Sequence, residues 1–151
     1  MPVIKIRTKI NAPKKTVFDL SINIAFHNQS TNSTNEFAID GITTGLTNYN
    51  ETVAWPGKYF GFNLTHKSKI TAMIQNEYFV DEMVEGKFKS FRHKHHFEEK
   101  NGFTIMKDKV YYEVPYGSLG EVFDFLFLKN YLINFLLERN KMLKKLSENE
   151  Q

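Results

Sequence analysis

Three histidines fall within four positions of this chain, in the stretch FRHKHHF at residues 91–97. An imidazole can ligate a metal, transfer a proton near neutral pH, or only hydrogen-bond to a neighbour. Because successive side chains of a strand point to opposite faces, His93 and His95 share one face with the two phenylalanines. His96 shares the other face with charged residues, which belong in water. We therefore expect His93 and His95 to point into the protein and His96 to point out of it.

The strand that follows supplies neighbours for these histidines. An Asn-Gly pair, a strong hairpin signal, separates it from the histidine strand. With the turn centred on residues 100–101, His95 lies opposite Met106 and His93 lies opposite Asp108. Directly opposed residues have Cβ atoms roughly 4.5–5.5 Å apart, which lets the carboxylate of Asp108 orient an imidazole.

Other strands add candidates to the same inner face. Glu51 is one of them. If its side chain points inward, the buried carboxylate needs a polar partner there. His27, on a short helical segment near the expected cavity mouth, is a weaker candidate for ligand contact, because a histidine in such a place is more often a surface residue. The residues expected to contact a ligand are Glu51, Val53, Trp55, His66, Asp81, Met83, Phe91, His93, His95, Met106 and Asp108.

Three interpretations of the polar groups compete, and the candidate catalytic residues are His93, His95, Asp108 and Asp81. In the first, H-x-H on a strand aims both rings the same way and a carboxylate completes a metal site. In the second, Asp108 holds His93 as a general base. In the third, the groups satisfy one another's hydrogen bonds beside a ligand, as most buried polar groups do. We favour the third, and we expect no bound metal and no cofactor.

The composition is that of a globular protein with many aromatic rings. The chain has 151 residues, enough for one domain with its own core, and we expect a single ligand-binding domain over residues 1–151. Aromatic residues make up 15% of it, and Phe accounts for 14 of them, which suits a broad core or an apolar pocket. There is no Cys, which excludes disulfides and thiolate chemistry.

Charge and hydropathy narrow the range of partners. Lys and Arg number 20 against 17 acids, a formal net charge of +3, but no basic stripe interleaves with stacking aromatics. We therefore expect no nucleic-acid partner. The first residues lack the apolar core of a signal peptide, and no run approaches the roughly 18 apolar residues of a membrane span. These features predict a cytoplasmic protein without stable membrane insertion.

Periodicity predicts an α+β fold. Residues 4–10 alternate as a half-buried strand, a short helical stretch follows, and residues 49–114 form successive strands joined by turns. Ser118 and Glu121 then form a capping-box pattern. From residue 119 to about residue 146, apolar residues recur at helical spacing without Pro, which predicts a helix about 40 Å long. Adjacent hairpins make the sheet antiparallel, and we expect the long helix to lie across a curved sheet.

Five segments, spread over most of the chain, carry a resemblance to a known family. They are I-x-A-P-x-x-x-V-F at residues 10–18, GLTNYNETVAW at 45–55, YFVDEMVEGKFKSFRHKHHFE at 78–98, M-x-D at 106–108 and PYGSLGEVFDFLFLKNYLINFLLERN at 115–140. Together they resemble the START-like, helix-grip (SRPBCC) superfamily, and within it a polyketide-cyclase-like group. The resemblance implies a curved antiparallel sheet wrapped around a long C-terminal helix, with short helices after the first strand. It also implies an apolar cavity for lipids, polyketides, steroids or other hydrophobic molecules, and it brings no metal.

The function expected from these features is binding of a small hydrophobic or amphipathic molecule, such as a lipid or polyketide, between sheet and helix. The first alternative is a cyclase, dehydratase or hydrolase that uses His93 or His95 with Asp108 or Asp81 as an acid–base pair. The second is a protein-interaction domain, like the chaperone-activating branch of the superfamily. A large apolar cavity favours the binder, converging polar groups favour the enzyme, and an exposed apolar patch favours the interaction domain.

Overall fold

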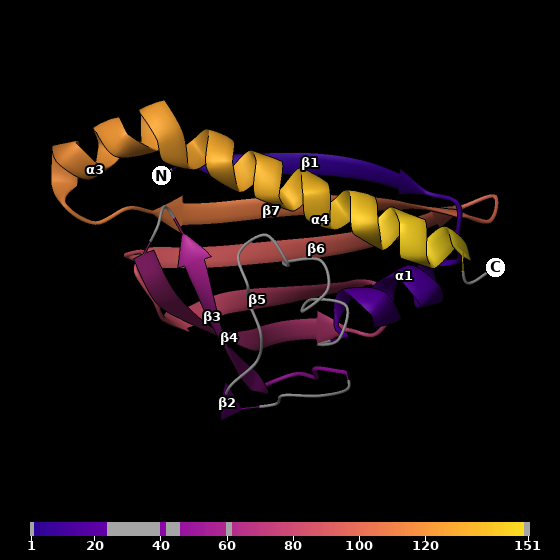
Figure 1. Cartoon of the computed structure of the whole chain (residues 1–151). Helices are drawn as coiled ribbons and strands as arrows, with labels where there is room; N and C mark the ends of the chain where they lie inside the picture. Colours follow the sequence, from indigo (N-terminus) through magenta and orange to yellow (C-terminus); the bar gives the residue numbers. More distant parts are fainter. Residues whose placement is uncertain (1, 24–39, 42–45, 60–61, 150–151) are drawn as a thin grey trace.

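The computed structural model describes residues 2–23, 40–41, 46–59 and 62–149, without the side chains of residues 40–41 and 55–63. Its strands form one antiparallel sheet in the order β1-β7-β6-β5-β4-β3-β2. Each strand from β2 to β7 pairs with the next along the chain, and β1 lies beside β7 (Figure 1). The strands are β1 (Val3–Ile10), β2 (Asp40–Gly41), β3 (Thr52–Tyr59), β4 (Phe62–Ile74), β5 (Tyr78–Glu85), β6 (Ser90–Lys100) and β7 (Phe103–Glu113).

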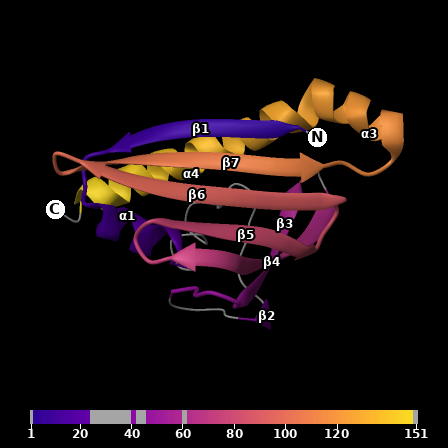
Figure 2. The ribbon, with the colours of Figure 1, turned by 180° about the vertical axis from the view of Figure 1, so that it is seen from behind.

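One long helix follows the sheet and crosses one of its faces (Figure 1). It runs without a break as α3 (Gly117–Phe123), a π-helical segment η2 (Asp124–Leu128) and α4 (Lys129–Asn149). Figure 2 shows the strands in front of this helix, with the short helix α1 (Lys14–Ser21) on the same side of the sheet as the long one. The predicted α+β helix-grip arrangement is confirmed.

The start of the long helix differs from the capping-box prediction. The residue before the helix is Tyr116 in the left-handed conformation, with φ 70°, and its side chain makes no capping hydrogen bond. Gly117 also has a positive φ of 55° and turns the chain into the helix, so Ser118 already lies within the first turn. The turn is tight, because a Cβ on Gly120 would lie 1.9 Å from the carbonyl oxygen of Pro115. That position therefore requires glycine.

The β6–β7 hairpin also differs from its predicted register. Lys100 pairs with Phe103, and the two turn residues, Asn101 and Gly102, both have positive φ, 51° and 84°. These angles belong to a type I′ turn, in which Asn and Gly occupy the two central positions. The turn is therefore centred one residue later than predicted, and every cross-strand pair of this hairpin is shifted by two residues.

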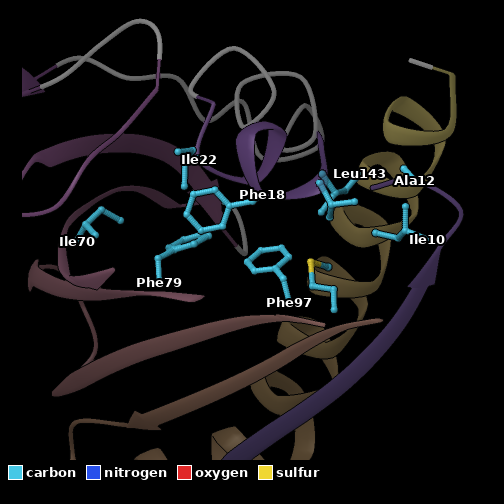
Figure 3. Close-up of a cluster of buried hydrophobic side chains, with 10 residues drawn as sticks. Ile10, Ala12, Phe18, Ile22, Ile70, Phe79, Phe97 and Leu143 are labelled. Atoms are coloured by element: carbon cyan, nitrogen blue, oxygen red, sulfur yellow. The ribbon is translucent and has the colours of Figure 1, made fainter. Parts of the chain in front are cut away.

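A hydrophobic core lies where α1 packs between the sheet and the C-terminal half of the long helix (Figure 3). Phe18 of α1 packs edge-on against Phe79 of β5 and Phe97 of β6, with ring centroids 5.7 and 5.4 Å apart. Leu143 of α4 is fully buried in the same cluster, so this packing holds α4 over this end of the sheet. The buried members are Ile10, Ala12, Val17, Phe18, Ile22, Ile70, Phe79, Phe97, Met106 and Leu143.

The N-terminal half of the helix lies over the other end of the sheet and packs less closely. A buried hydrogen bond connects it to the sheet, in which the hydroxyl of Tyr112 on β7 donates to Oδ1 of Asp124 at 2.6 Å. A smaller core of Ile4, Val110, Tyr112 and Leu136 lies beside it. Most of the apolar side chains of α3 and η2 nevertheless stay exposed, and a cavity lies beneath them.

Candidate functional site

The cavity between the N-terminal half of the long helix and the sheet has a volume of about 570 Å³. The helix contributes a mainly apolar wall, with Leu119, Phe123, Leu128, Leu132, Phe135 and Leu136. The sheet contributes a wall that is apolar near Phe88 and Phe91. Further along, it becomes polar at Ser68, Asp81, His93 and His95. The cavity thus combines a long apolar lining with one concentrated polar region.

Two histidines and two aspartates form a connected cluster in that polar region. Nε2 of His93 lies 2.8 Å from Oδ1 of Asp108, and Nε2 of His95 lies 2.8 Å from Oδ2 of Asp81. Nδ1 of His95 lies 3.2 Å from the same oxygen of Asp108. The two imidazole rings stack with their centroids 3.6 Å apart. We call this continuous series, Asp81–His95–Asp108–His93, the His–Asp chain.

Three adjacent strands supply the His–Asp chain. On the backbone, His93 of β6 pairs with Asp81 of β5, and His95 of β6 pairs with Asp108 of β7. Each 2.8 Å contact is therefore diagonal, because it joins a histidine to the aspartate that lies opposite the other histidine. The sequence-based register places His93 directly opposite Asp108, which is wrong because the turn is centred one residue later. The two residues are nevertheless in contact.

Burial and outside partners hold the His–Asp chain in position. His95 and Asp108 are almost completely buried, and Asp81 is partly exposed to the cavity. Nδ2 of Asn140 in α4 donates to Oδ2 of Asp108 at 2.7 Å. Phe79 stacks on His95 with ring centroids 4.1 Å apart. Asp108 therefore contacts the histidines through one oxygen and the long helix through the other, which ties the site to the helix above it.

Burial and hydrogen bonding determine the charges of the His–Asp chain. Burial alone would raise the pKa of both carboxyls, but the histidine hydrogen bonds outweigh it. The pKa of Asp81 is lowered to about 2, and the pKa of Asp108 lies well below its ordinary value. Burial lowers the pKa of His93, and the neighbouring His95 lowers it further. Burial also acts to lower the pKa of His95, but hydrogen bonds to Asp108 and Asp81 raise it overall.

These charge states and distances permit two kinds of chemistry. His93 uses Nε2 for Asp108, which leaves Nδ1 to accept a hydrogen bond or a proton from a molecule in the cavity. A neutral imidazole held by a carboxylate is the arrangement of a general base. In addition, one donor atom from each of Asp81, His93 and His95 lies within 4.8 Å of the other two, as a metal site requires. The sequence suggests both options, and the structure adds the position of Asp81.

Sequence reasoning missed Arg139, a cation in the cavity wall. It lies on α4, is only 6% exposed, and lines both the main cavity and a second one of about 80 Å³. Ser68, Asp81 and His95 also line both cavities, so these four residues lie between them. A signal was present in the sequence, because Arg139 follows Leu136 by three residues and precedes Leu143 by four, within the apolar stripe of the helix. A cation in such a stripe needs a polar partner.

Four other predicted contact residues line one of the two cavities. His66 and Phe91 line the main cavity, where their rings meet edge to face with centroids 5.4 Å apart. Glu51 and Val53 line the smaller cavity instead. The four residues therefore face the inner side of the sheet but do not share one cavity, and their contact with a ligand stays a prediction.

The other predicted contacts lie elsewhere. Met106 is fully buried in the core, opposite Phe97, because of the two-residue shift of the hairpin. Met83 is outside the described linings of both cavities, and its sulfur lies over the glycine of the turn that follows β5. The side chain of Trp55 and the whole of His27 lie outside the described residues.

Exposed apolar side chains form a rim around the mouth of the main cavity. Tyr116, Leu119 and Phe123 line the cavity and are also 84%, 79% and 42% exposed. A surface patch of this kind often marks a binding surface. It is the feature expected of an interaction domain, but three of its members also belong to the cavity wall. Along the same helix, further large apolar residues are exposed, namely Val122, Phe125, Leu126 and Phe127.

Comparison with known proteins bears on the fold. No protein-family model matches the chain, and no curated protein matches it either. Among solved structures, ginseng major latex-like protein 151 from Panax ginseng is similar, with a TM-score of 0.71 and 17% identity over 97% of each chain. A START superfamily protein from Mycobacterium smegmatis gives a TM-score of 0.70 and 11% identity over 99% of each chain. A protein from Chromobacterium violaceum gives 0.74 and 8% identity, covering 97% of this chain and 96% of its own.

These similarities define the class of the protein, which has the START-like helix-grip fold. At such low identity the likeness concerns the fold alone, so the polyketide-cyclase-like grouping stays a prediction. Within the described part of the chain, no helix combines the length and the hydropathy needed to cross a bilayer.

Proposed function

We propose that this chain is a single-domain, cytoplasmic protein that binds a small, largely apolar molecule with one polar end. The observation that carries the proposal is the cavity of about 570 Å³, which is apolar along the helix and polar around the His–Asp chain. Small-molecule sites commonly measure about 300–1,000 Å³ and combine an apolar lining with a few placed polar groups. The cavity has both properties.

The uneven lining implies an orientation for the ligand. Its apolar body gains roughly 25 cal/mol for each Å² that it buries against residues such as Phe91 and Leu132. Its polar end loses hydrogen bonds to water and needs new partners. His93 and Arg139 can supply them, since an imidazole can donate or accept and a guanidinium donates. A ketone, alcohol or acid at one end of a lipid-like or polyketide-like body matches this arrangement.

The test begins with native mass spectrometry of protein purified from its own host, together with a fluorescence screen of lipids and polyketides. With a ligand found, Phe91→Ala is expected to weaken binding by about 1.5–3 kcal/mol, the worth of burying a Phe side chain. Leu137→Ala is the control, since Leu137 is an apolar residue of the long helix that borders the cavity but is 48% exposed and outside the described cavity lining. The proposal fails if no apolar compound binds or if both variants bind as the wild type does.

An enzymatic function is the second candidate, and one specific observation favours it. Asp108 fixes Nε2 of His93 while the histidine borders the cavity, as a general base for a cyclase, dehydratase or hydrolase would require. If a bound compound is also converted, His93→Gln is expected to leave binding nearly intact and to lower turnover by about 10²–10⁴-fold. In a protein that only binds, the same variant changes affinity modestly and there is no turnover to lose.

A further inference from the structure

Three side chains in the cavity wall converge on one point. A donor atom of each of Asp81, His93 and His95 lies within 4.8 Å of the other two. Nε2 of His95 meets Asp81 at 2.8 Å. For His93, the contact between Nε2 and Asp108 leaves Nδ1 as the nitrogen available to a ligand. All three residues line the main cavity, so the point at which they converge lies in its wall.

We propose that Asp81, His93 and His95 bind a divalent first-row transition-metal ion, with open coordination positions directed into the cavity. Two imidazoles and one carboxylate form the donor set of catalytic zinc sites and of non-haem iron sites. Three protein ligands leave room for water or for the polar end of a bound molecule. The site does not depend on the proposed ligand, because the metal can be tested alone.

The surroundings of the histidines support this assignment. A metal-bound histidine almost always donates its other ring N–H to a carboxylate, a carbonyl or water. Asp108 provides such an acceptor for both rings, 2.8 Å from Nε2 of His93 and 3.2 Å from Nδ1 of His95. Asn140 holds the second oxygen of Asp108 at 2.7 Å. One buried carboxylate can therefore orient both imidazoles toward the same ion.

The protonation of His95 fits the same assignment. Nδ1 of His95 is buried and has Oδ1 of Asp108 as its polar neighbour at 3.2 Å. A metal on Nε2 of His95 would keep the remaining ring proton on Nδ1, directed toward Asp108. The ion would also add positive charge beside the two carboxylates, which already accept hydrogen bonds from the histidines.

The sequence alone favours the opposite expectation of no metal, because the chain lacks Cys and the family resemblance brings no metal site. The third ligand changes this balance. Asp81 lies on a different strand from the histidines, and its contact with His95 depends on how β5 and β6 align. Metal titration decides between the two expectations.

The probe is Co²⁺, whose visible absorption reports inner-sphere ligands, added to the full-length, untagged protein after treatment with a chelator. The absorption is expected to saturate at one ion per chain and to disappear when Zn²⁺ displaces Co²⁺. Loss of a ligand in His93→Ala or His95→Ala is expected to abolish saturable binding. Asp108→Asn keeps the shape of the side chain but weakens its support of both rings, and it is expected to lower affinity roughly 10–100-fold.

The matched control removes a competing surface site on the same strand. Nδ1 of His96 lies 3.7 Å from Oε1 of Glu98 on the outer face of β6, and this pair could hold a metal adventitiously. The double variant His96→Ala, Glu98→Gln is expected to bind Co²⁺ as the wild type does. Circular dichroism checks that each variant folds. Where an alanine variant does not fold, Asp81→Asn replaces it. This variant is expected to weaken Co²⁺ binding. Absence of a saturable band in the wild type, loss of binding in the control, or unchanged binding in Asp81→Asn each overturns the proposal.

Discussion

The two halves of the long helix pack differently on the same sheet. In the C-terminal half, Leu143 is fully buried in the core around α1, and Met142 and Leu146 are partly buried against the same core. In the N-terminal half, Leu119 and Phe125 are 79% and 81% exposed. Both halves carry apolar residues at helical spacing, so periodicity does not distinguish them. The difference lies beneath the helix, where α1 fills the space under one half and a cavity of about 570 Å³ remains under the other.

This difference separates stability from binding along one helix. An apolar side chain stabilises the fold only as far as folding removes it from water. The C-terminal half therefore contributes to the core, whereas the N-terminal half supplies a cavity wall whose apolar residues are ready to contact a ligand. A π-helical segment, Asp124–Leu128, lies within the N-terminal half, and such segments are frequent at functional sites.

The largest effect on stability is expected in the C-terminal half, from Leu143→Ala. Leu143 is fully buried in the core that α1, the sheet and α4 share, so truncation leaves a cavity there (Figure 3). Substitutions of this kind reduce the free energy of unfolding by about 2–5 kcal/mol. Chemical denaturation measures the change, and Leu137→Ala on the exposed side of the same helix is expected to stay within about 0.5 kcal/mol. Equal losses in the two variants would contradict the placement of Leu143 in the core.

A smaller effect is expected from Tyr112→Phe, which removes the connection between the sheet and the N-terminal half. The change leaves the buried carboxylate of Asp124 without its 2.6 Å hydrogen bond, at a cost of about 1–3 kcal/mol. Amide hydrogen exchange is expected to accelerate in residues 117–128 more than in residues 136–149. Tyr111→Phe, at the neighbouring position on the partly exposed side of β7, is the control and is expected to leave both segments unchanged.

Features that follow from a local sequence pattern could be predicted from the sequence. Alternation along residues 91–97 correctly predicts that His93 and His95 point inward and that His96 is exposed. Local turn chemistry was sufficient to set the hairpin register as well, because Asn-Gly fills both central positions of a type I′ turn. Placing the turn one residue early therefore gave the wrong directly opposed residue for each histidine, although His93 still contacts Asp108 diagonally.

Other features depend on how separate elements meet, which no local pattern encodes. The contact between Asp81 and His95 requires the alignment of β5 with β6. The pairing of β5 with β4 on its other side contains register shifts, which the sequence does not reveal. Arg139 lines the cavity because of how α4 is rotated above the sheet. The exposure of Leu119 depends on what lies under α3, and helical spacing says nothing about that.

The smallest expected effects come from a matched pair in the N-terminal half, Leu119→Ala and Phe125→Ala. Both side chains are about four-fifths exposed, 79% and 81%, so each variant is expected to keep its free energy of unfolding within about 0.5 kcal/mol of the wild type. The two residues differ in their relation to the cavity, because Leu119 lines it and Phe125 is outside its described lining.

Ligand binding is therefore expected to separate the two variants where stability does not. A bound apolar probe is expected to cover part of the Leu119 side chain. Leu119→Ala is therefore expected to lower the affinity for the probe by less than about tenfold, that is, by less than about 1.4 kcal/mol. Phe125→Ala is expected to leave affinity unchanged, and a fluorescence titration of both proteins with the same probe measures the difference. If both variants weaken binding equally, the probe covers the whole exposed face of the helix, and that face is then a docking surface in its own right. If neither does, the ligand lies deeper, against Phe91 and the His–Asp chain, and the rim contributes only to entry.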